Sequence, residues 1–385
     1  MFEVLQKLCV KLNGRCNFNC LYCHQPLLEK THGDFDKFEQ LEMFLQSLNN
    51  YDKEVEIVCG GGEPTLVPNL IRKFKKITDR LEVLKNISVN LSLVTNGSRL
   101  NVLASLIDDC ILDPKNIGIS WDGDSTTRQS DGELIDKLCK YDFCNDVNVT
   151  YAITPLSINS MVNDFKKCWD CGIKDVSYYF IHEGDYTDVK LQEKFKENIT
   201  ELADEFIKRK KYDEKLDFFN LTYWHYCNNH KKPQMCTKLG KGFSIGLDGK
   251  IYPCIYFGDH HKNAIGDIFN GLNNDLIAKF LEEYNQPYTC NWKTCNNYNC
   301  QECPASNSVH NGSCSCKMIN ICKMHDIERE VYSKYDIKID FDEPMLSTSI
   351  PQFMTQEKQN TTHTNIFSDQ CIQSPSLERV RSWND

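Results

Sequence analysis

The sequence has 385 residues, of which 41% are hydrophobic, and its formal net charge at pH 7 is −10. This length and composition support a folded protein with one large domain and a smaller one. The acidic balance argues against a nucleic-acid partner, which needs concentrated positive charge, and no run approaches the roughly 20 apolar residues that a membrane helix requires. The start, Met1-Phe2-Glu3, lacks the features of a secretory signal, so we expect a cytoplasmic protein with no membrane partner.

The cysteine content is unusually high. The chain has 21 cysteines, and in a reducing compartment disulfides rarely explain such a number. Ten of them fall in residues 227–322 and three in residues 16–23, and clustering of this kind suggests metal. Isolated cysteines in apolar surroundings, such as Cys9, Cys110 and Cys139, are expected to be buried small hydrophobic residues.

Up to about residue 182, strand-like runs alternate with helical patterns. Predicted strands span Leu5–Leu12, Val55–Cys59, Val89–Thr95, Asn116–Trp121, Val147–Ile153 and Asp175–Ile181. Predicted helices span Phe35–Leu48, Val67–Leu84, Arg99–Asp108, Glu133–Lys140 and Ser157–Cys171, and a long charged helix is expected over Asp188–Lys211. A parallel βα array of this kind forms a doubly wound sheet or a whole or partial barrel. In both, ligands gather at the carboxyl ends of the strands.

Three cysteines follow the first predicted strand, in Leu12-Asn-Gly-Arg-Cys16-Asn-Phe-Asn-Cys20-Leu-Tyr-Cys23. Three thiolates on a four-iron cluster leave one iron open to a further ligand, whereas an electron-carrying cluster normally has four cysteines. The alternatives are a zinc knuckle or three reduced structural cysteines. Structural zinc takes four ligands, and no fourth lies nearby.

This Cys-x3-Cys-x2-Cys spacing, with Tyr22 before the last cysteine, resembles the signature of the radical S-adenosylmethionine (SAM) superfamily. The resemblance implies that Cys16, Cys20 and Cys23 hold a catalytic 4Fe–4S cluster whose open iron binds SAM. An electron from the cluster would then cleave SAM to a 5′-deoxyadenosyl radical, which abstracts a substrate hydrogen. It also implies an α/β fold with a partial (βα)6 TIM-like barrel, a SAM contact from Tyr22, and an external electron donor of the flavodoxin or ferredoxin type.

The second predicted strand ends in Gly61-Gly62-Glu63-Pro64, which resembles the Gly-Gly-Glu-Pro turn of the same superfamily. Glycines let a backbone approach a ligand closely, and a carboxylate favours an ammonium group. The resemblance implies that Gly61, Gly62 and Glu63 bind the SAM amino group. An ordinary Gly/Pro loop is the alternative.

Later strand ends carry weaker motifs of the same kind. Thr95-Asn96-Gly97 and Ser120-Trp121-Asp122-Gly123 both look like strand-end motifs of the superfamily, although either can be a simple turn. By resemblance, the SAM-binding residues would include Asn96, Ser120 at the ribose, Arg128 at the carboxylate and Ile153 at the adenine.

Cys236, Gly249 and Cys254 form Cys-x12-Gly-x4-Cys, which resembles the start of a SPASM domain, an extension that holds auxiliary iron–sulfur clusters in many peptide-modifying radical SAM enzymes. Asp248-Gly249 predicts a hairpin turn. The resemblance implies one or two auxiliary clusters. A zinc ribbon is the alternative, because cysteine spacing alone does not select iron over zinc. The candidate ligands are Cys236, Cys254, Cys295, Cys300, Cys303, Cys314, Cys316 and Cys322.

We predict three parts: a radical SAM partial barrel over 1–225, a small Cys-rich SPASM-like iron–sulfur domain over 226–330, and a mostly disordered tail over 331–385. The resemblance implies an enzyme, an oxidoreductase that modifies a ribosomally made peptide or a protein side chain. Crosslinking is the modification that we expect. A separate leader-recognition protein is a candidate partner. The alternatives are an anaerobic sulfatase maturase, a small-molecule dehydrogenase, or a non-enzymatic zinc or electron-transfer protein. No catalytic base is identified.

Overall fold

The computed structural model describes residues 4–23, 25, 33–123, 133–181, 184–218, 220–222, 242–284 and 319–335. All of these belong to one compact unit, Met1–Thr355. Seven candidate site residues lie outside the described ranges, so their roles stay predictions. They are Arg128, Cys236, Cys295, Cys300, Cys303, Cys314 and Cys316.

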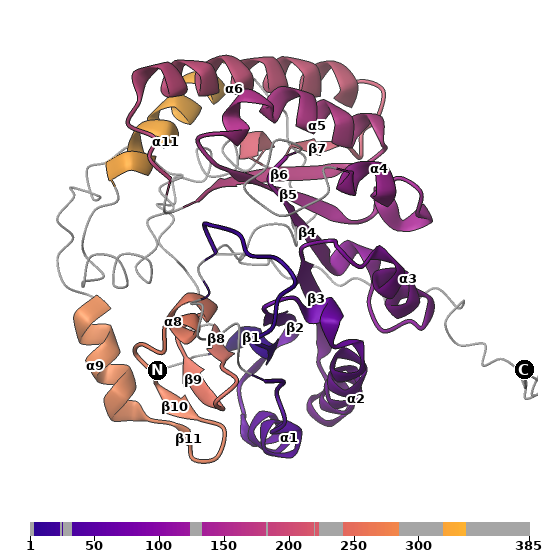
Figure 1. Ribbon diagram of the computed structural model, residues 1–385. Helices are drawn as coiled ribbons and strands as arrows, with labels where there is room; N and C mark the ends of the chain where they lie inside the picture. The colour runs from indigo at the N-terminus through magenta and orange to yellow at the C-terminus, as the bar shows by residue number, and fades with distance from the viewer. Residues whose placement is uncertain are drawn as a thin grey trace, which may run out of the picture. The chain divides into compact units, whose positions relative to one another are not determined.

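The core of the fold is a curved parallel sheet, in which each strand pairs with the next along the chain. Its strands are β1 (Leu5–Asn13), β2 (Tyr51–Gly61), β3 (Ser88–Thr95), β4 (Ile117–Trp121), β5 (Asn148–Ile153), β6 (Asp175–Phe180) and β7 (Asp217–Phe218). The six predicted strands are confirmed, as is the α/β class with a partial barrel (Figure 1).

Helices follow the strands and cover the outer face of the sheet (Figure 1). They are α1 (Phe38–Ser47), α2 (Pro68–Lys85), α3 (Leu100–Asp108), α4 (Leu134–Leu138), α5 (Met161–Asp170) and α6 (Val189–Lys210). Each predicted helix is confirmed, and α5 begins later than predicted because Ser157–Asn159 form a separate 3-10 turn. The Asp188 side chain caps α6 by accepting a hydrogen bond from the Lys190 amide, 2.9 Å away.

The two faces of the sheet differ in character. On the outer face, Phe165 of α5 packs edge-to-face against Tyr151 of β5 and Tyr178 of β6, with ring centroids 5.5 and 6.4 Å apart. Because side chains alternate along a strand, the residues next to these tyrosines on β5 and β6 face the barrel interior. There Ser177 donates a hydrogen bond to Thr150 over 3.3 Å. The outer face therefore holds the apolar core, and the inner face offers polar groups.

The sheet continues beyond β1 on its other edge. β8 (Gly242–Ile245) pairs parallel with β1, and β9 (Lys250–Tyr252), β10 (Gly266–Asp267) and β11 (Gly271–Leu272) follow antiparallel. The predicted hairpin at Asp248-Gly249 is confirmed, and Gly249 has a φ of +82° that glycine adopts without strain. Two helices, α8 (Ile255–Asp259) and α9 (Asn274–Tyr284), accompany these strands.

The last described helix, α11 (Ile319–Tyr332), lies beside α6 (Figure 1). A buried polar network joins it to β6. The Tyr178 hydroxyl donates to the Glu328 carboxylate and lies 2.6 Å from the Tyr332 hydroxyl, and His325 Nδ1 lies 2.5 Å from the other Glu328 oxygen. Burial raises the pKa of Tyr178 and Tyr332 well above the usual value, so both hydroxyls stay protonated. The predicted tail boundary at residue 330 falls inside this helix.

Two expectations about isolated cysteines are wrong. Cys139, at the end of α4, forms a disulfide with Cys171, at the end of α5. Cys110 is exposed, with a φ of +53°, because the chain turns sharply after α3. Cys9 is half-buried. Among the described helices, none is long and apolar enough to cross a membrane.

Candidate active site

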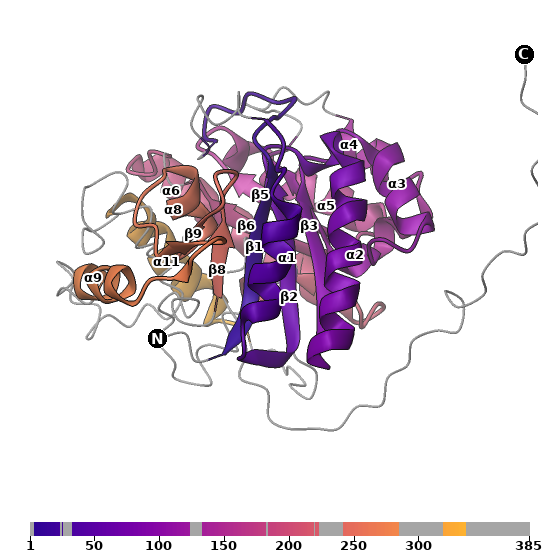
Figure 2. The ribbon, with the colours of Figure 1, turned by 90° about the horizontal axis from the view of Figure 1, so that it is seen from below.

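The three-cysteine loop leaves the carboxyl end of β1, beyond the ends of the neighbouring parallel strands (Figure 2). Cys16, Cys20 and Cys23 are half-buried and form no disulfide, and the Cys23 amide donates to the Cys20 carbonyl oxygen over 3.2 Å. Burial raises the pKa of the Cys16 thiol, and the neighbouring Glu63, Cys20 and Cys23 raise it further. The three thiols therefore lie close enough to interact electrostatically.

A bidentate ion pair holds the beginning of this loop. Arg15 Nη2 contacts both carboxylate oxygens of Asp34, at 2.7 and 2.9 Å. Farther along, the buried Gln25 side chain donates to the Gly14 carbonyl oxygen over 2.9 Å. These contacts tie residues on the far side of the three cysteines, Gln25 and Asp34, to the segment that directly follows β1, which limits the positions that the cysteines can adopt.

The Gly-Gly-Glu turn after β2 packs directly against the same loop. The Gly62 amide donates to the Asn13 carbonyl at 3.0 Å, and the Glu63 amide donates to the Arg15 carbonyl at 2.7 Å. A Cβ atom on Gly62 would lie 2.1 Å from the Arg15 carbonyl oxygen, and one on Gly61 would lie 2.4 Å from that of Asn13. Both positions therefore require glycine for contact between the two loops, whether or not a ligand is bound.

The Glu63 carboxylate is 1% exposed and is engaged within the protein. Its Oε1 accepts hydrogen bonds from the Thr65 amide, the Thr65 hydroxyl and the Thr95 hydroxyl, at 3.0, 2.5 and 2.7 Å. Its Oε2 accepts from the Asn96 amide at 2.8 Å. The carboxylate thus joins the ends of β2 and β3, a role that the sequence motif did not reveal. This geometry does not favour the predicted ammonium contact.

Asn96 and Tyr22 connect the cysteine loop to two further strand ends. Asn96 Nδ2 contacts Asn17 Oδ1 at 3.0 Å and Cys16 Sγ at 3.8 Å. The Tyr22 hydroxyl donates to the Asp122 carboxylate, just after β4, at 3.0 Å. Asp122 is fully buried, and although it stands in the Ser120-Trp121-Asp122-Gly123 motif, no role was predicted for it. An acidic residue directly after a predicted strand is the signal that could have identified it, because a buried carboxylate needs a hydrogen-bond partner.

The other two described residues that were predicted to contact SAM, Ser120 and Ile153, lie on opposite faces of the sheet. Ser120 is half-buried on β4, on the strand face opposite to Trp121 and therefore toward the barrel interior. Ile153 is fully buried and shares the face of Tyr151, which packs on α5. That position does not favour the predicted adenine contact of the Ile153 side chain.

Two of the predicted auxiliary ligands are described. Cys254 is half-buried at the start of α8, and Cys322 is half-buried in α11. Within the described ranges, no three His, Cys, Asp or Glu side chains are already gathered as a metal site. The N-terminal donor set nevertheless fits a cluster with three thiolate ligands, because Cys16, Cys20 and Cys23 are half-buried on one loop and both Cys20 and Cys23 lie near Cys16.

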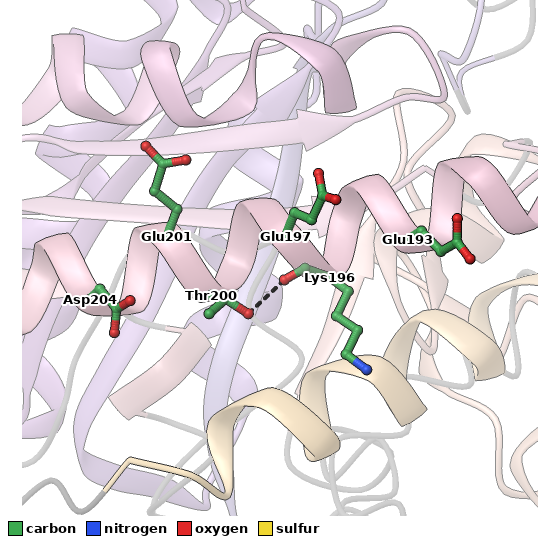
Figure 3. A pocket seen from close by; sticks show the side chains of 6 residues that line it. All are labelled: Glu193, Lys196, Glu197, Thr200, Glu201 and Asp204. Carbon is green, nitrogen blue, oxygen red and sulfur yellow. Dashed lines mark hydrogen bonds between the residues drawn. The ribbon is translucent and has the colours of Figure 1, made fainter.

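A separate open groove runs along α6 (Figure 3). Its lining is mainly acidic, with Glu193, Glu197, Glu201 and Asp204 beside Lys196 and Thr200. Lys196 pairs with Glu330 of α11 at 2.6 Å, and Glu201 pairs with Lys166 at 2.7 Å. The groove lies on the outer face of the barrel, away from the cysteine loop. Because its charges are paired and solvated, we assign it to the protein surface and not to the active site.

Residues 10–150, which include the cysteine loop and the Gly-Gly-Glu turn, match the profile described as Radical SAM superfamily. Over this segment the chain is similar to proteins of the radical SAM superfamily, which are enzymes that use a 4Fe–4S cluster and SAM.

Curated relatives are also similar to this chain in sequence. A probable GTP 3′,8-cyclase of Thermoplasma volcanium is 32% identical over 155 residues, which is 40% of this chain and 44% of the relative. Another, of Methanothermobacter thermautotrophicus, is 23% identical over 74% of this chain and 96% of its own length. The chain thus spans less than half the length of the first of these relatives.

Solved structures share the fold over more of the chain. The structure of anSMEcpe with bound AdoMet superposes with a TM-score of 0.63 and 18% identity, over 86% of this chain and 96% of that chain. The structure of Streptococcus suis SuiB bound to the precursor peptide SuiA gives a TM-score of 0.53 and 16% identity, over 83% and 76%. At these identities the likeness concerns the fold.

Proposed function

We propose that this protein is a radical SAM enzyme that cleaves SAM reductively at a 4Fe–4S cluster held by Cys16, Cys20 and Cys23, and that it oxidatively modifies a ribosomally made peptide. The observation that carries the proposal is the placement of the three thiols on one loop at the carboxyl ends of the parallel strands. This is the edge at which barrels of this class carry their chemistry. When bound, the cluster and SAM supply an organic radical that abstracts a substrate hydrogen.

In this account the residues of the chain bind the cluster, hold the cysteine loop in place and form the surface that substrate and SAM would contact. The cysteines provide thiolate ligands, and the Gly-Gly-Glu turn and Asn96 hold the loop against β2 and β3. Tyr22 fixes the last part of the loop against Asp122. In this account substrate and SAM would bind toward the inner face, which carries polar groups such as Thr150 and Ser177. A preorganised loop of this kind reduces the reorganisation needed when the ligands bind.

A peptide substrate is supported by the fold likeness to proteins whose structures were solved with bound peptides. These include anSMEcpe with AdoMet and the Cp18Cys peptide, with a TM-score of 0.61, and SuiB with SuiA. We propose crosslinking as the modification, with a flavodoxin or ferredoxin as electron donor and a leader-recognition protein as a further partner. The likeness in fold to anSMEcpe covers 86% of this chain, whereas the longer of the two sequence matches given above covers 74%, which favours this choice.

The second candidate function is a reaction on GTP, because the two curated relatives described above are probable GTP 3′,8-cyclases. The two candidates separate in one assay. Reconstituted protein with SAM and dithionite is incubated with GTP or with short peptides encoded beside its gene, and substrate-dependent 5′-deoxyadenosine is measured with the mass of each product. Stimulation by GTP alone, with a cyclised product, would overturn the peptide assignment.

One or two auxiliary clusters in the Cys-rich region complete the proposal, with Cys254 and Cys322 among the ligands. Their role would be in substrate modification, which follows SAM cleavage. Reconstituted protein should then bind more than four irons per chain, and Cys254→Ala should retain SAM cleavage but lose product. Iron that saturates at four in the native protein, with zinc present instead, would contradict this part of the proposal.

A further inference from the structure

Asn96, the first residue after β3, reaches from the sheet to the loop of the catalytic cysteines, and its amide orientation is fixed by its neighbours. The Ser98 amide donates to Asn96 Oδ1 at 3.0 Å. A backbone N–H can only donate, so the oxygen must face Ser98, and the NH2 group must face the other way. The orientation of this side chain therefore follows from its hydrogen bonds.

The Asn96 NH2 group faces the cysteine loop. It donates to Asn17 Oδ1 at 3.0 Å and to Cys16 Sγ at 3.8 Å. Asn17 is itself held, because its Nδ2 donates to the Ser98 hydroxyl at 2.9 Å. Asn96 is only 8% exposed, so water competes little for these bonds. A second donor, the Phe18 amide, lies 3.4 Å from the same sulfur.

The buried Glu63 carboxylate holds the backbone that carries Asn96. Its Oε2 accepts from the Asn96 amide at 2.8 Å, and its Oε1 accepts from the hydroxyl of the preceding residue, Thr95, at 2.7 Å. Hydrogen bonds to an ionised acceptor are about twice as strong as those between neutral groups. Glu63 therefore fixes the strand end from which the Asn96 side chain reaches Cys16.

We propose that Asn96 tunes the reduction potential of the catalytic cluster through its hydrogen bond to Cys16 Sγ, and that Glu63 is the positioning residue that aims it. The inference rests on the proposed function, in which Cys16 is a cluster ligand. A donor to a ligating sulfur withdraws electron density and stabilises the reduced, more negative cluster, which raises the potential. Asn96 thus eases delivery of the electron that SAM cleavage needs.

The test is a potentiometric titration of the reconstituted holoenzyme without SAM, with the reduced cluster followed by electron paramagnetic resonance. Asn96→Ser retains a side-chain oxygen for the Ser98 amide but is too short to reach the sulfur. We expect its ratio of reduced to oxidised cluster at a fixed potential to fall about tenfold, which is about 59 mV for a one-electron couple. Thr95→Val, which removes a hydrogen bond between this strand end and Glu63 without changing any charge, should shift the potential in the same direction.

Asn90 provides a matched control, because it lies on the same strand and donates to Glu54 of β2 at 2.7 Å. Asn90→Leu should leave the potential unchanged. An unchanged potential in Asn96→Ser, with a native protein that cleaves SAM, would overturn the tuning role and leave the proposed function intact. If both site variants fail to hold iron while Asn90→Leu retains it, Asn96 serves assembly and the tuning role is again overturned. A native protein that forms no cluster would overturn both proposals.

Discussion

The Tyr22 hydroxyl donates a hydrogen bond to the Asp122 carboxylate over 3.0 Å, although the two residues are 100 positions apart in the sequence. Tyr22 belongs to the cysteine loop after β1, and Asp122 follows β4. Asp122 is fully buried, so loss of a donor there costs more than loss of the same bond at the surface. The contact therefore anchors the last part of the loop across the mouth of the barrel.

Replacement of Tyr22 by Phe removes this donor and leaves the ring. We expect a loss of about 1–2 kcal/mol in the free energy of unfolding, and a lower iron content after reconstitution. Urea denaturation of the apoprotein and iron analysis measure the two effects. Tyr212→Phe is the control, since Tyr212 is 89% exposed. Equal stability and iron content in the two variants would show that the contact has no anchoring role.

The contact between the Gly-Gly-Glu turn and the cysteine loop predicts that Gly62→Ala is harmful. Its Cβ would lie 2.1 Å from the Arg15 carbonyl oxygen, and both atoms belong to backbones that must move apart. We expect a loss of about 1–3 kcal/mol in unfolding free energy and weaker iron binding. Gly33→Ala is the control, because nothing lies within 4 Å of its Cβ. Tolerance of Gly62→Ala would mean that the two loops are not in contact.

The disulfide between Cys139 and Cys171 closes a loop between residues separated by 32 positions. In the chain-entropy account such a crosslink stabilises a protein by about 2–4 kcal/mol. Cys139→Ser should lower the melting temperature of the oxidised protein, and a reducing agent should abolish the difference from the native chain. Alkylation and mass spectrometry report whether the bond is present. Full alkylation of both thiols in unreduced protein would contradict it.

The buried network of α11 predicts unequal effects of two similar substitutions. Glu328 is 3% exposed and contacts Tyr178 and His325, whereas Glu330 has a side chain that is 52% exposed and pairs with Lys196. Glu328→Gln should cost about 1–3 kcal/mol because it disrupts buried acceptors. Glu330→Gln should cost no more than about 1 kcal/mol, since exposed ion pairs contribute little. Comparable losses in denaturant titrations would show that α11 is not anchored there.

Local patterns predicted the barrel well because they depend on near neighbours. Alternation in strands and the 3.6-residue period of helices placed β1–β6 and α1–α6, and the Asp-Gly pair located the β8–β9 turn. Contacts between segments that are far apart in the chain have no local sequence pattern that predicts them. The pairing of β8 with β1, the disulfide of Cys139 and the docking of α11 on β6 depend on tertiary packing alone.

In the candidate active site, too, local features were predicted and long-range contacts were not. The spacing of Cys16, Cys20 and Cys23 identified the loop, because three thiolates supplied by a single loop lie close together in the sequence as well. The sequence also indicated that Glu63 matters, but not how. Its four donors come from Thr65, Thr95 and Asn96, and only the folded arrangement of β2 and β3 brings them to one carboxylate.

The most direct test of the central claim is the formation of 5′-deoxyadenosine from SAM by anaerobically reconstituted protein supplied with dithionite. The account predicts product from the native chain and none from Cys16→Ala, Cys20→Ala or Cys23→Ala. Cys110→Ser, which changes an exposed cysteine away from the loop, should remain active. Circular dichroism of each variant establishes that the barrel is folded. Product from any folded variant of the three loop cysteines at the native rate, or no product from the native chain when its cluster is present, would contradict the account.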